Sequence, residues 1–224
     1  MNIFAPALEK KIAASGNIAV VVIDDAAKAL PLAEALLAGG VDVMELTLRT
    51  PVALDAIRAI AGRVKGMLVG AGTVLTPTQL KQVSDAGAAF AVAPGFNPRV
   101  VAAAKEMGFS FAPGVMTPSE IEGALEAGCR LLKYFPAGVV GGLKGIKNIA
   151  APYAHLGIRF IPLGGLTPET SAEYFGSPLI AACGGSWIAP AKLIAAGDWS
   201  AIRENAAKAT AIAKAARALP QKTS

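Results

Sequence analysis

A lysine lies inside a short apolar run, "CRLLKYFPAG", at residues 129–138. Burying an ammonium is costly, so a lysine within a core strand is paired, deprotonated or chemically employed. Burial of Lys133 would favour the neutral amine, which is a nucleophile and forms imines with ketones. The simpler interpretation is a lysine that reaches water from the end of the strand, or that neutralises an acid as a structural ion pair.

A second stretch, "VDVMELTLRT", alternates apolar and polar residues. Side chains on a strand alternate between its faces, so Glu45, Thr47 and Arg49 share one face. In an antiparallel sheet this pattern marks a solvated face. In a parallel barrel it places an acid, a hydroxyl and a guanidinium inside, toward the end where barrel enzymes hold their active sites. Glu45 could then move protons for chemistry at Lys133.

Two glycine-rich turns, "PLGGLTPE" and "ACGGSWIAP", follow two late apolar runs. They contain Gly164 and Gly165 in the first turn, and Gly184, Gly185 and Ser186 in the second. Glycines let the backbone approach a ligand closely, and amides at a helix N-terminus attract anions. One Gly-Gly pair is commonly just a turn, but two of them at the loops where barrels bind phosphate predict an anion site.

The elements that must position these residues form a weak repeat. Each unit has an Ala-rich amphipathic helix, a glycine expected to be its left-handed C-cap, and a short apolar strand, as in "IEGALEAGCRLLKYFP". Helices are expected to begin at "TPTQ", "NPRV", "TPSE" and "TPET", where a Thr or Asn cap precedes Pro. The nearly all-apolar strand runs indicate a parallel sheet covered on both faces. Strands are predicted at Ile18–Ile23, Val41–Leu48, Met67–Ala71, Phe90–Ala93, Phe109–Ala112, Leu131–Phe135, Arg159–Leu163 and Leu179–Cys183.

Alternating strands and helices in 224 residues predict an α/β fold, a (β/α)₈ TIM barrel. A doubly wound open sheet is the second possibility, although no GxGxxG follows the first strand. Residues 1–224 are expected to form a single domain, with a short N-terminal helix and a C-terminal helical tail from about Ala201 that frays at its end. Within the barrel, Pro94 and Phe135 would form apolar walls beside Lys133.

Composition argues against several classes of function. Apolar residues make up 54% and charged residues 17%, which argues against disorder. The net charge of +5 is scattered, so we expect a small anionic metabolite rather than nucleic acid as ligand. The single histidine, His155, is expected at a surface helix end, and no CxxC or HxxxH occurs. A zinc site or a Ser-His-Asp hydrolase is therefore not expected, and neither is a cofactor.

The location of the protein is predicted from its apolar runs and its cysteines. The chain shows no secretory signal pattern and no apolar run long enough to span a membrane. Cys129 and Cys183 lie far apart without a pairing pattern, as expected of reduced core residues in a cytoplasmic protein. The residues alone thus predict a metal-independent Schiff-base lyase or aldolase that acts on a small anion.

Seven motifs resemble, in order and spacing, those of the KDPG/KHG aldolase family: "VMELTLRT", "VGAGTVLTP", "VAPGF", "FAPGVMTPSE", "LLKYFPA", "IPLGG" and "GGSW". The resemblance spans about Ile18 to Pro190, and "GGSW" favours its KDPG branch. It implies a class I aldolase that reversibly cleaves 2-keto-3-deoxy-6-phosphogluconate (KDPG) to pyruvate and D-glyceraldehyde 3-phosphate, in the Entner–Doudoroff pathway. It also implies a homotrimer of (β/α)₈ barrels.

The resemblance also implies a role for each matching residue. Lys133 would be the Schiff-base lysine and Glu45 the general acid/base. The positions for substrate would be Arg49 and Thr73 at the pyruvoyl carboxylate, Pro94 and Phe135 as pocket walls, and Gly164, Gly165, Gly185 and Ser186 at the phosphate. Thr73 is assigned through the resemblance alone.

One position departs from the family pattern. Where many relatives read "PTGG", this chain reads "PLGG", so that Leu163 replaces a hydroxyl beside the substrate's central hydroxyls. A buried hydroxyl contact contributes strongly to substrate discrimination. Schiff-base chemistry should survive this change, whereas the choice of substrate is open.

Two alternatives to a KDPG aldolase remain open. The first is a class I pyruvate aldolase for a related 2-keto acid: the C4 epimer, 4-hydroxy-2-oxoglutarate, or a sulfonate such as 2-keto-3,6-dideoxy-6-sulfogluconate. The second is a barrel without activity that senses phosphorylated sugar acids. A sensor has no use for a buried nucleophilic amine, which favours an enzyme.

Overall fold

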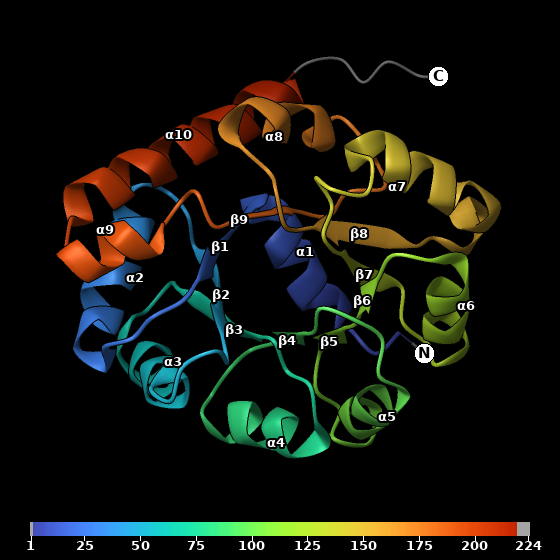
Figure 1. The fold of residues 1–224 in the computed structure, drawn as a ribbon, viewed down its shortest axis with the longest axis horizontal. Helices are drawn as coiled ribbons and strands as arrows, with labels where there is room; N and C mark the ends of the chain where they lie inside the picture. Colours follow the sequence, from blue (N-terminus) through green and yellow to red (C-terminus); the bar gives the residue numbers. More distant parts are fainter. Residues whose placement is uncertain (1, 219–224) are drawn as a thin grey trace.

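The computed structural model describes residues 2–218 and shows a ring of parallel strands surrounded by helices (Figure 1). Every strand pairing in the ring is parallel. The strands are β1 (Asn17–Val21), β2 (Val43–Thr47), β3 (Leu68–Gly72), β4 (Ala91–Val92), β5 (Phe111–Ala112), β6 (Gly114–Val115), β7 (Leu131–Tyr134), β8 (Arg159–Pro162) and β9 (Cys183–Gly185). The helices are α1 (Pro6–Ser15), η1 (Ala26–Lys28), α2 (Ala29–Ala38), α3 (Ala53–Arg63), α4 (Pro77–Asp85), α5 (Pro98–Glu106), α6 (Pro118–Glu126), α7 (Gly142–Ala150), η2 (Ala151–Leu156), α8 (Pro168–Phe175), α9 (Ala191–Ala196) and α10 (Trp199–Ala218).

The ring closes through two seams. One sheet has the order β5-β4-β3-β2-β1-β9 and the other the order β6-β7-β8. The predicted fifth strand, Phe109–Ala112, is shortened to β5, and β6 follows beyond it after Pro113, which has no N–H to give to a ladder. The seam between β8 and β9 is joined by a bridge between Phe160 and Ile180, and Arg159 reinforces it by donating to the Ile180 carbonyl (3.1 Å). The predicted (β/α)₈ barrel is confirmed, and the open doubly wound sheet is wrong.

Helix starts and stops follow local chemistry. Thr76, Asn97, Thr117 and Thr167 accept hydrogen bonds from the backbone of α4, α5, α6 and α8, and a Pro follows each. Glycines with positive φ follow the helices of the repeat, such as Gly87 (φ 90°) after α4. The predicted last strand is displaced, because pairing with β1 begins at Cys183 and continues through the glycines that follow. The predicted C-terminal helix is α10; the fraying expected of its end concerns residues 219–224, which lie outside the described part.

Two apolar layers fix the barrel. The inner layer includes Val43, Leu68, Phe90, Leu131 and Ile161, one or more from most strands. Met44, Leu46, Leu132 and Tyr134 belong to the outer layer, which packs against the helices. The inward parity predicted for β2 and β7 is therefore confirmed.

Helix α1 lies behind the centre of the ring and closes one of its ends (Figure 1). Phe4 and Ile12 pack into the inner layer, and Glu9 pairs with Arg159, the first residue of β8, at 3.1 Å. This end is the N-terminal end of the strands, so the opposite, C-terminal end is left for a site. Along residues 2–218, no helix combines the length and the apolar character needed to cross a membrane.

Candidate active site

The centre of the candidate site is a contact between Lys133 on β7 and Glu45 on β2. Lys133 Nζ donates to Glu45 Oε1 at 3.0 Å, and their side chains are 6% and 1% exposed. Both residues project inward because they follow the parity of Val43 and Leu131. Of the two interpretations raised by the sequence, a lysine that escapes to water is excluded, and a buried pair is observed.

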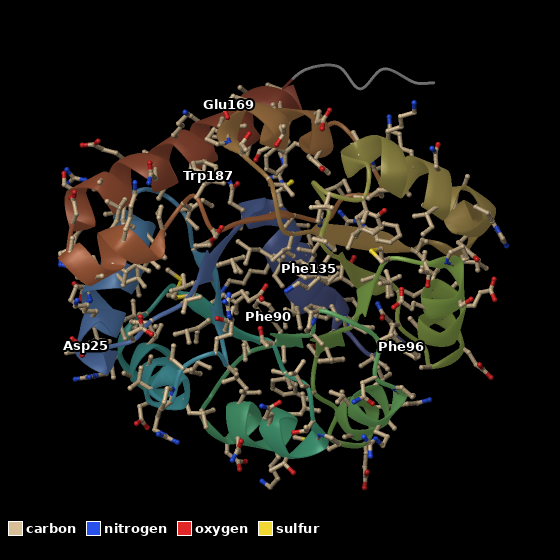
Figure 2. All side chains as sticks on the ribbon, viewed as in Figure 1. Asp25, Phe90, Phe96, Phe135, Glu169 and Trp187 are labelled. Carbon is tan, nitrogen blue, oxygen red and sulfur yellow. The ribbon has the colours of Figure 1, made fainter. Side chains whose placement is uncertain are left out.

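Phe135 forms a wall over this pair. Lys133 Nζ lies 5.4 Å from the centre of the Phe135 ring, which is near the middle of the ring of strands in Figure 2. The ring packs on Gly164, where an added Cβ would lie 2.9 Å from Phe135 Cε2. A larger residue at position 164 would therefore push Phe135 from its place beside the lysine.

Thr73 is held in an unusual backbone conformation at the end of β3. Its φ of 59° is in the left-handed region, which is unfavourable for a β-branched residue. Such outliers cost about 1–3 kcal/mol and concentrate at functional sites. The side chain of Thr73 is partly exposed, as a ligand-binding residue requires.

Two polar residues predicted to share a face with Glu45 are placed differently from one another. The Thr47 hydroxyl is buried and donates to the Val21 carbonyl at 3.1 Å, so its role is to join β2 to β1. Arg49 lies beyond the end of β2 in a turn and is exposed. Among residues 2–218 its guanidinium has no ion-pair partner, which leaves it available to an anion.

The first glycine turn is tied to the loop after β7. Gly164 and Gly165 have φ values of 86° and 78°, in the region that glycine favours. The Gly138 amide donates to the Gly164 carbonyl at 2.8 Å. An added Cβ on Gly138 would collide with the Gly165 carbonyl oxygen at 2.8 Å, and one on Gly165 would lie 3.2 Å from Gly138 Cα.

In the second glycine turn, Gly184 and Gly185 are buried in β9, and Ser186 is exposed directly after it. The side chain of Leu163 is 3% exposed and covers Gly184, where an added Cβ would meet Leu163 Cγ at 2.5 Å. Leu163 therefore fills the inner layer between β8 and β9. It presents no hydroxyl to a ligand at this point.

Pro94 is also at the C-terminal end of its strand, β4. Its carbonyl backbone packs against Gly114, which pairs in register with Lys133. The structure thus gathers the predicted residues toward one end of the barrel. They lie within, or in the loops directly after, β2, β3, β4, β7, β8 and β9. Direct contacts join Lys133, Glu45, Phe135 and Gly164.

Other titratable residues lie outside this site. His155 is exposed in η2, in agreement with the prediction. Burial raises the pKa of the Cys129 thiol to about 12 and raises the pKa of Cys183 as well. Within the described part of the chain, no group of three His, Cys, Asp or Glu side chains could hold a metal ion.

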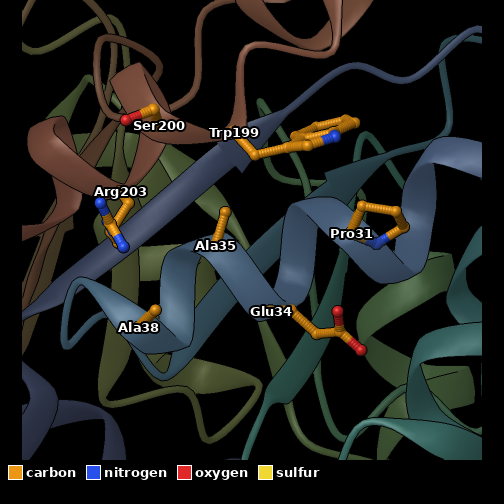
Figure 3. A pocket seen from close by; sticks show the side chains of 7 residues that line it. All are labelled: Pro31, Glu34, Ala35, Ala38, Trp199, Ser200 and Arg203. Carbon is orange, nitrogen blue, oxygen red and sulfur yellow. The ribbon is translucent and has the colours of Figure 1, made fainter.

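A hollow of about 370 Å³ lies on the outside of the barrel, between α2 and α10 (Figure 3). Its lining includes Pro31 and Glu34 on α2 and Trp199 and Arg203 on α10. None of its lining residues is a predicted site residue. It is therefore separate from the candidate active site.

Taken together, fold and site define a (β/α)₈ barrel with a buried amine–carboxylate pair at the end where barrel enzymes react. The sequence model of the KDPG and KHG aldolases matches residues 8–205. The chain belongs to this family.

Known relatives are similar over most of their length. A 2-dehydro-3-deoxy-phosphogluconate aldolase of Treponema pallidum is 48% identical over 83% of this chain and 87% of its own. The KHG/KDPG aldolase of Escherichia coli is 43% identical over 87% of this chain and 91% of its own. A crystal structure of KDPG aldolase from Legionella pneumophila, with pyruvate captured as a covalent carbinolamine intermediate, superposes with a TM-score of 0.85; it is 39% identical and the match covers 90% of this chain and 97% of that one.

Proposed function

We propose that this protein is a class I aldolase that reversibly cleaves KDPG to pyruvate and D-glyceraldehyde 3-phosphate through a Schiff base on Lys133, as a step of the Entner–Doudoroff pathway. The observation that carries the proposal is the buried contact of 3.0 Å between Lys133 and Glu45 at the C-terminal end of the barrel. Relatives named for this activity, one of them with a covalent pyruvate carbinolamine, support it.

The reaction begins when the Lys133 ammonium passes a proton to Glu45, and the resulting neutral amine attacks the C2 carbonyl of the substrate to form a carbinolamine. Glu45, within hydrogen-bond distance of Nζ, gives the proton with which the hydroxyl leaves as water, and the protonated imine forms. Glu45, now the carboxylate, takes the proton of the C4 hydroxyl, and the C3–C4 bond breaks. Its electron pair moves to the imine nitrogen, which yields an enamine and the aldehyde.

In the second half, Glu45 in its acid form protonates C3 of the enamine. Water adds to the resulting imine, and the carbinolamine collapses to release pyruvate and the amine of Lys133. We assign the pyruvoyl carboxylate to Arg49 and Thr73, which are both accessible and follow neighbouring strands. The cycle consumes and returns each proton and needs no oxidant or cofactor.

We assign the other end of the substrate to the two glycine turns. Gly164, Gly165, Gly185 and Ser186 follow β8 and β9, the last two strand positions, where barrels commonly bind phosphate. Pro94 and Phe135 would wall the space between these ends, and Leu163 would border it from the inner layer.

Leu163 favours a second candidate substrate class, anionic 2-keto acids other than KDPG. Its buried side chain offers no hydrogen bond to the substrate's central hydroxyls. The E. coli relative is named for both KHG and KDPG, which supports a second substrate as a candidate. The C4 epimer, 4-hydroxy-2-oxoglutarate and the sulfonate analogue are the alternatives to test.

The decisive experiment is borohydride reduction in the presence of pyruvate, followed by peptide mass spectrometry. We expect a reduced pyruvate adduct on Lys133, and no adduct on any other lysine. A folded protein that binds pyruvate without an adduct would be a sensor and not an aldolase. Synthesis from pyruvate and a panel of aldehydes, phosphorylated and not, then ranks the substrates.

We also propose that the chain is one domain, that it assembles as a homotrimer, and that it works in the cytoplasm. The burial of two reduced thiols, Cys129 and Cys183, supports a reducing compartment. Exposed apolar side chains such as Leu75 and Met116, in loops at the C-terminal ends of β3 and β6, offer surface for contact between copies. Sedimentation equilibrium at three times the monomer mass and one cooperative unfolding transition are expected.

A further inference from the structure

We propose that Gly72 is a positioning residue: the missing side chain at the end of β3 leaves the space in which the Glu45 carboxylate reaches Lys133. This inference rests on the proposed function and adds a residue that sequence analysis did not single out. Gly72 is part of "GAGT", where a glycine at a strand end is easily taken for a turn former.

The geometry places the two residues on neighbouring strands. Glu45 pairs in register with Gly70, and Thr47 pairs with Gly72. The Glu45 side chain therefore leans along β3, past its own register partner, to the next residue on the same face, Gly72. A Cβ built on Gly72 would overlap Glu45 Oε1 and would lie 2.7 Å from both its Cδ and its Cγ. Carbon atoms in favourable contact are about 3.5–4.0 Å apart, so the whole end of the Glu45 side chain would have to move.

The backbone does not require glycine at this position. Gly72 is the last residue of β3 and has ordinary strand geometry, unlike Thr73, which has a positive φ. Alanine would therefore fit the backbone of residue 72. The three atoms nearest to its methyl group would all belong to Glu45.

Displacement of the carboxylate would remove it from the reacting atoms. Glu45 is 1% exposed, so its side chain cannot swing out to water. Lys133 is held on the far side by β6 and β8, with Gly114 and Ile161 as its register partners. We therefore expect alanine at position 72 to separate carboxylate from amine while the amine keeps its place.

The same strand supplies a matched control in Gly70. An added Cβ there would lie 2.5 Å from Phe90 Cε1 and Cε2, which belong to the inner layer. Gly70→Ala thus creates a comparable collision inside the barrel, and the three atoms nearest to its methyl group belong to Phe90 and not to Glu45. Both variants should lose stability, but only Gly72→Ala should lose proton transfer.

The readout is the exchange of pyruvate methyl hydrogens for deuterium, followed by NMR at saturating pyruvate. This exchange requires the imine and then proton transfer at C3, with no aldehyde present. We expect Gly72→Ala to retain the borohydride adduct on Lys133 and to exchange about 10²–10⁴-fold more slowly than wild type, the range for loss of a general acid/base. Gly70→Ala should exchange within about threefold of wild type, a margin well below that range.

A double-variant cycle tests whether Gly72 acts through Glu45. In the Glu45→Ala background no long side chain occupies the space, so adding Gly72→Ala should change exchange by no more than about twofold, since the two sites then share no interaction. If Gly72→Ala slowed exchange in the Glu45→Ala protein as much as it does in the protein with Glu45, the proposal would be overturned. Equal exchange rates for Gly72→Ala and Gly70→Ala would overturn it as well. If Gly72→Ala does not fold, the double variant must fold; a double variant that is also unfolded overturns the proposal. Absence of a pyruvate adduct in wild type would instead refute the proposed function. The free energies of unfolding of wild type, both single variants and the double variant would then still test the packing of Gly72 against Glu45.

Discussion

Replacing Lys133 by methionine removes the ammonium and leaves an unbranched apolar side chain of similar length. The Glu45 carboxylate then stays in the barrel with 1% exposure and without its partner at 3.0 Å. At an effective dielectric constant of about 20, a charge pair at this distance is worth roughly 5 kcal/mol before desolvation is counted. Removal of one member of a buried pair costs about 3–5 kcal/mol, because the other charge is left uncompensated. We expect Lys133→Met to lose that much free energy of unfolding.

The second half of this prediction concerns the double variant Lys133→Met/Glu45→Gln. Because the remaining charge is gone, stability should return to within about 1–2 kcal/mol of wild type, as for buried pairs exchanged for uncharged groups. Neither variant should form the pyruvate adduct or cleave KDPG. The double variant would thus separate loss of chemistry from loss of fold.

Urea unfolding followed by circular dichroism measures both quantities, with equal m values as the check on two-state behaviour. A Lys133→Met protein as stable as wild type would show that the carboxylate is solvated or protonated at no cost, and the reasoning from burial would be refuted. If the double variant were less stable than Lys133→Met, the uncompensated charge of Glu45 would not be the cause of the lost stability. The hydrogen bond and the packing of the two side chains would then be the main contributions of the pair.

Substitutions at other positions give separate tests. Glu45→Gln should slow exchange of the pyruvate methyl hydrogens about 10²–10⁴-fold and keep adduct formation, and unchanged turnover would make Glu45 a structural partner. Leu163→Thr should destabilise the barrel by about 1–3 kcal/mol, since it loses packing on Gly184 and buries a hydroxyl, and should raise KDPG turnover relative to the other acids; an unchanged substrate ranking would make the position neutral. Burial raises the pKa of Cys129 from 9.0 to about 12, so the folded state holds this proton longer than the unfolded state. The contribution of this thiol to stability should therefore be constant below pH 9 and fall above it by up to about 1.4 kcal/mol per pH unit. Cys129→Ala should remove this contribution and leave that of Cys183, so the variant should lose less stability than wild type between pH 8 and pH 10 in urea unfolding.

The parts of the molecule that follow from local rules were predictable from the sequence. Strand parity placed Glu45 and Lys133 inside before any neighbour was known, because side chains on a strand alternate and a parallel barrel has no wet face. The Thr-Pro helix starts follow from capping, which involves residues within one turn. Thr47 shows where such rules end. Its parity was right, but its hydroxyl is used by the Val21 carbonyl of the adjacent strand, a partner that depends on register between strands.

Long-range packing explains the other differences. The N-terminal helix was expected, but the insertion of Phe4, which precedes this helix, beside Phe90 in the inner layer depends on the closed ring. The break between β5 and β6 at Pro113 is a local effect, yet its consequence, a seam between the sheet that ends at β5 and the sheet that begins at β6, appears only when the ring closes. Each of these features needs three-dimensional neighbours that periodicity does not supply.

The interior of this barrel is built from pairs in which a large side chain on one strand covers a glycine on a neighbouring element. Phe90 covers Gly70, Glu45 covers Gly72 and Leu163 covers Gly184. Protein interiors are close-packed, so the volume at each level is fixed and a change in one member of a pair must be met by the other. If Leu163 borders the substrate as proposed, substrate choice is coupled to position 184: a smaller residue at 163 would leave a space beside Gly184 that a ligand hydroxyl or water could enter. The same reasoning makes Glu45 reactive by position as well as by type, because its reach toward Lys133 depends on an absent side chain at Gly72.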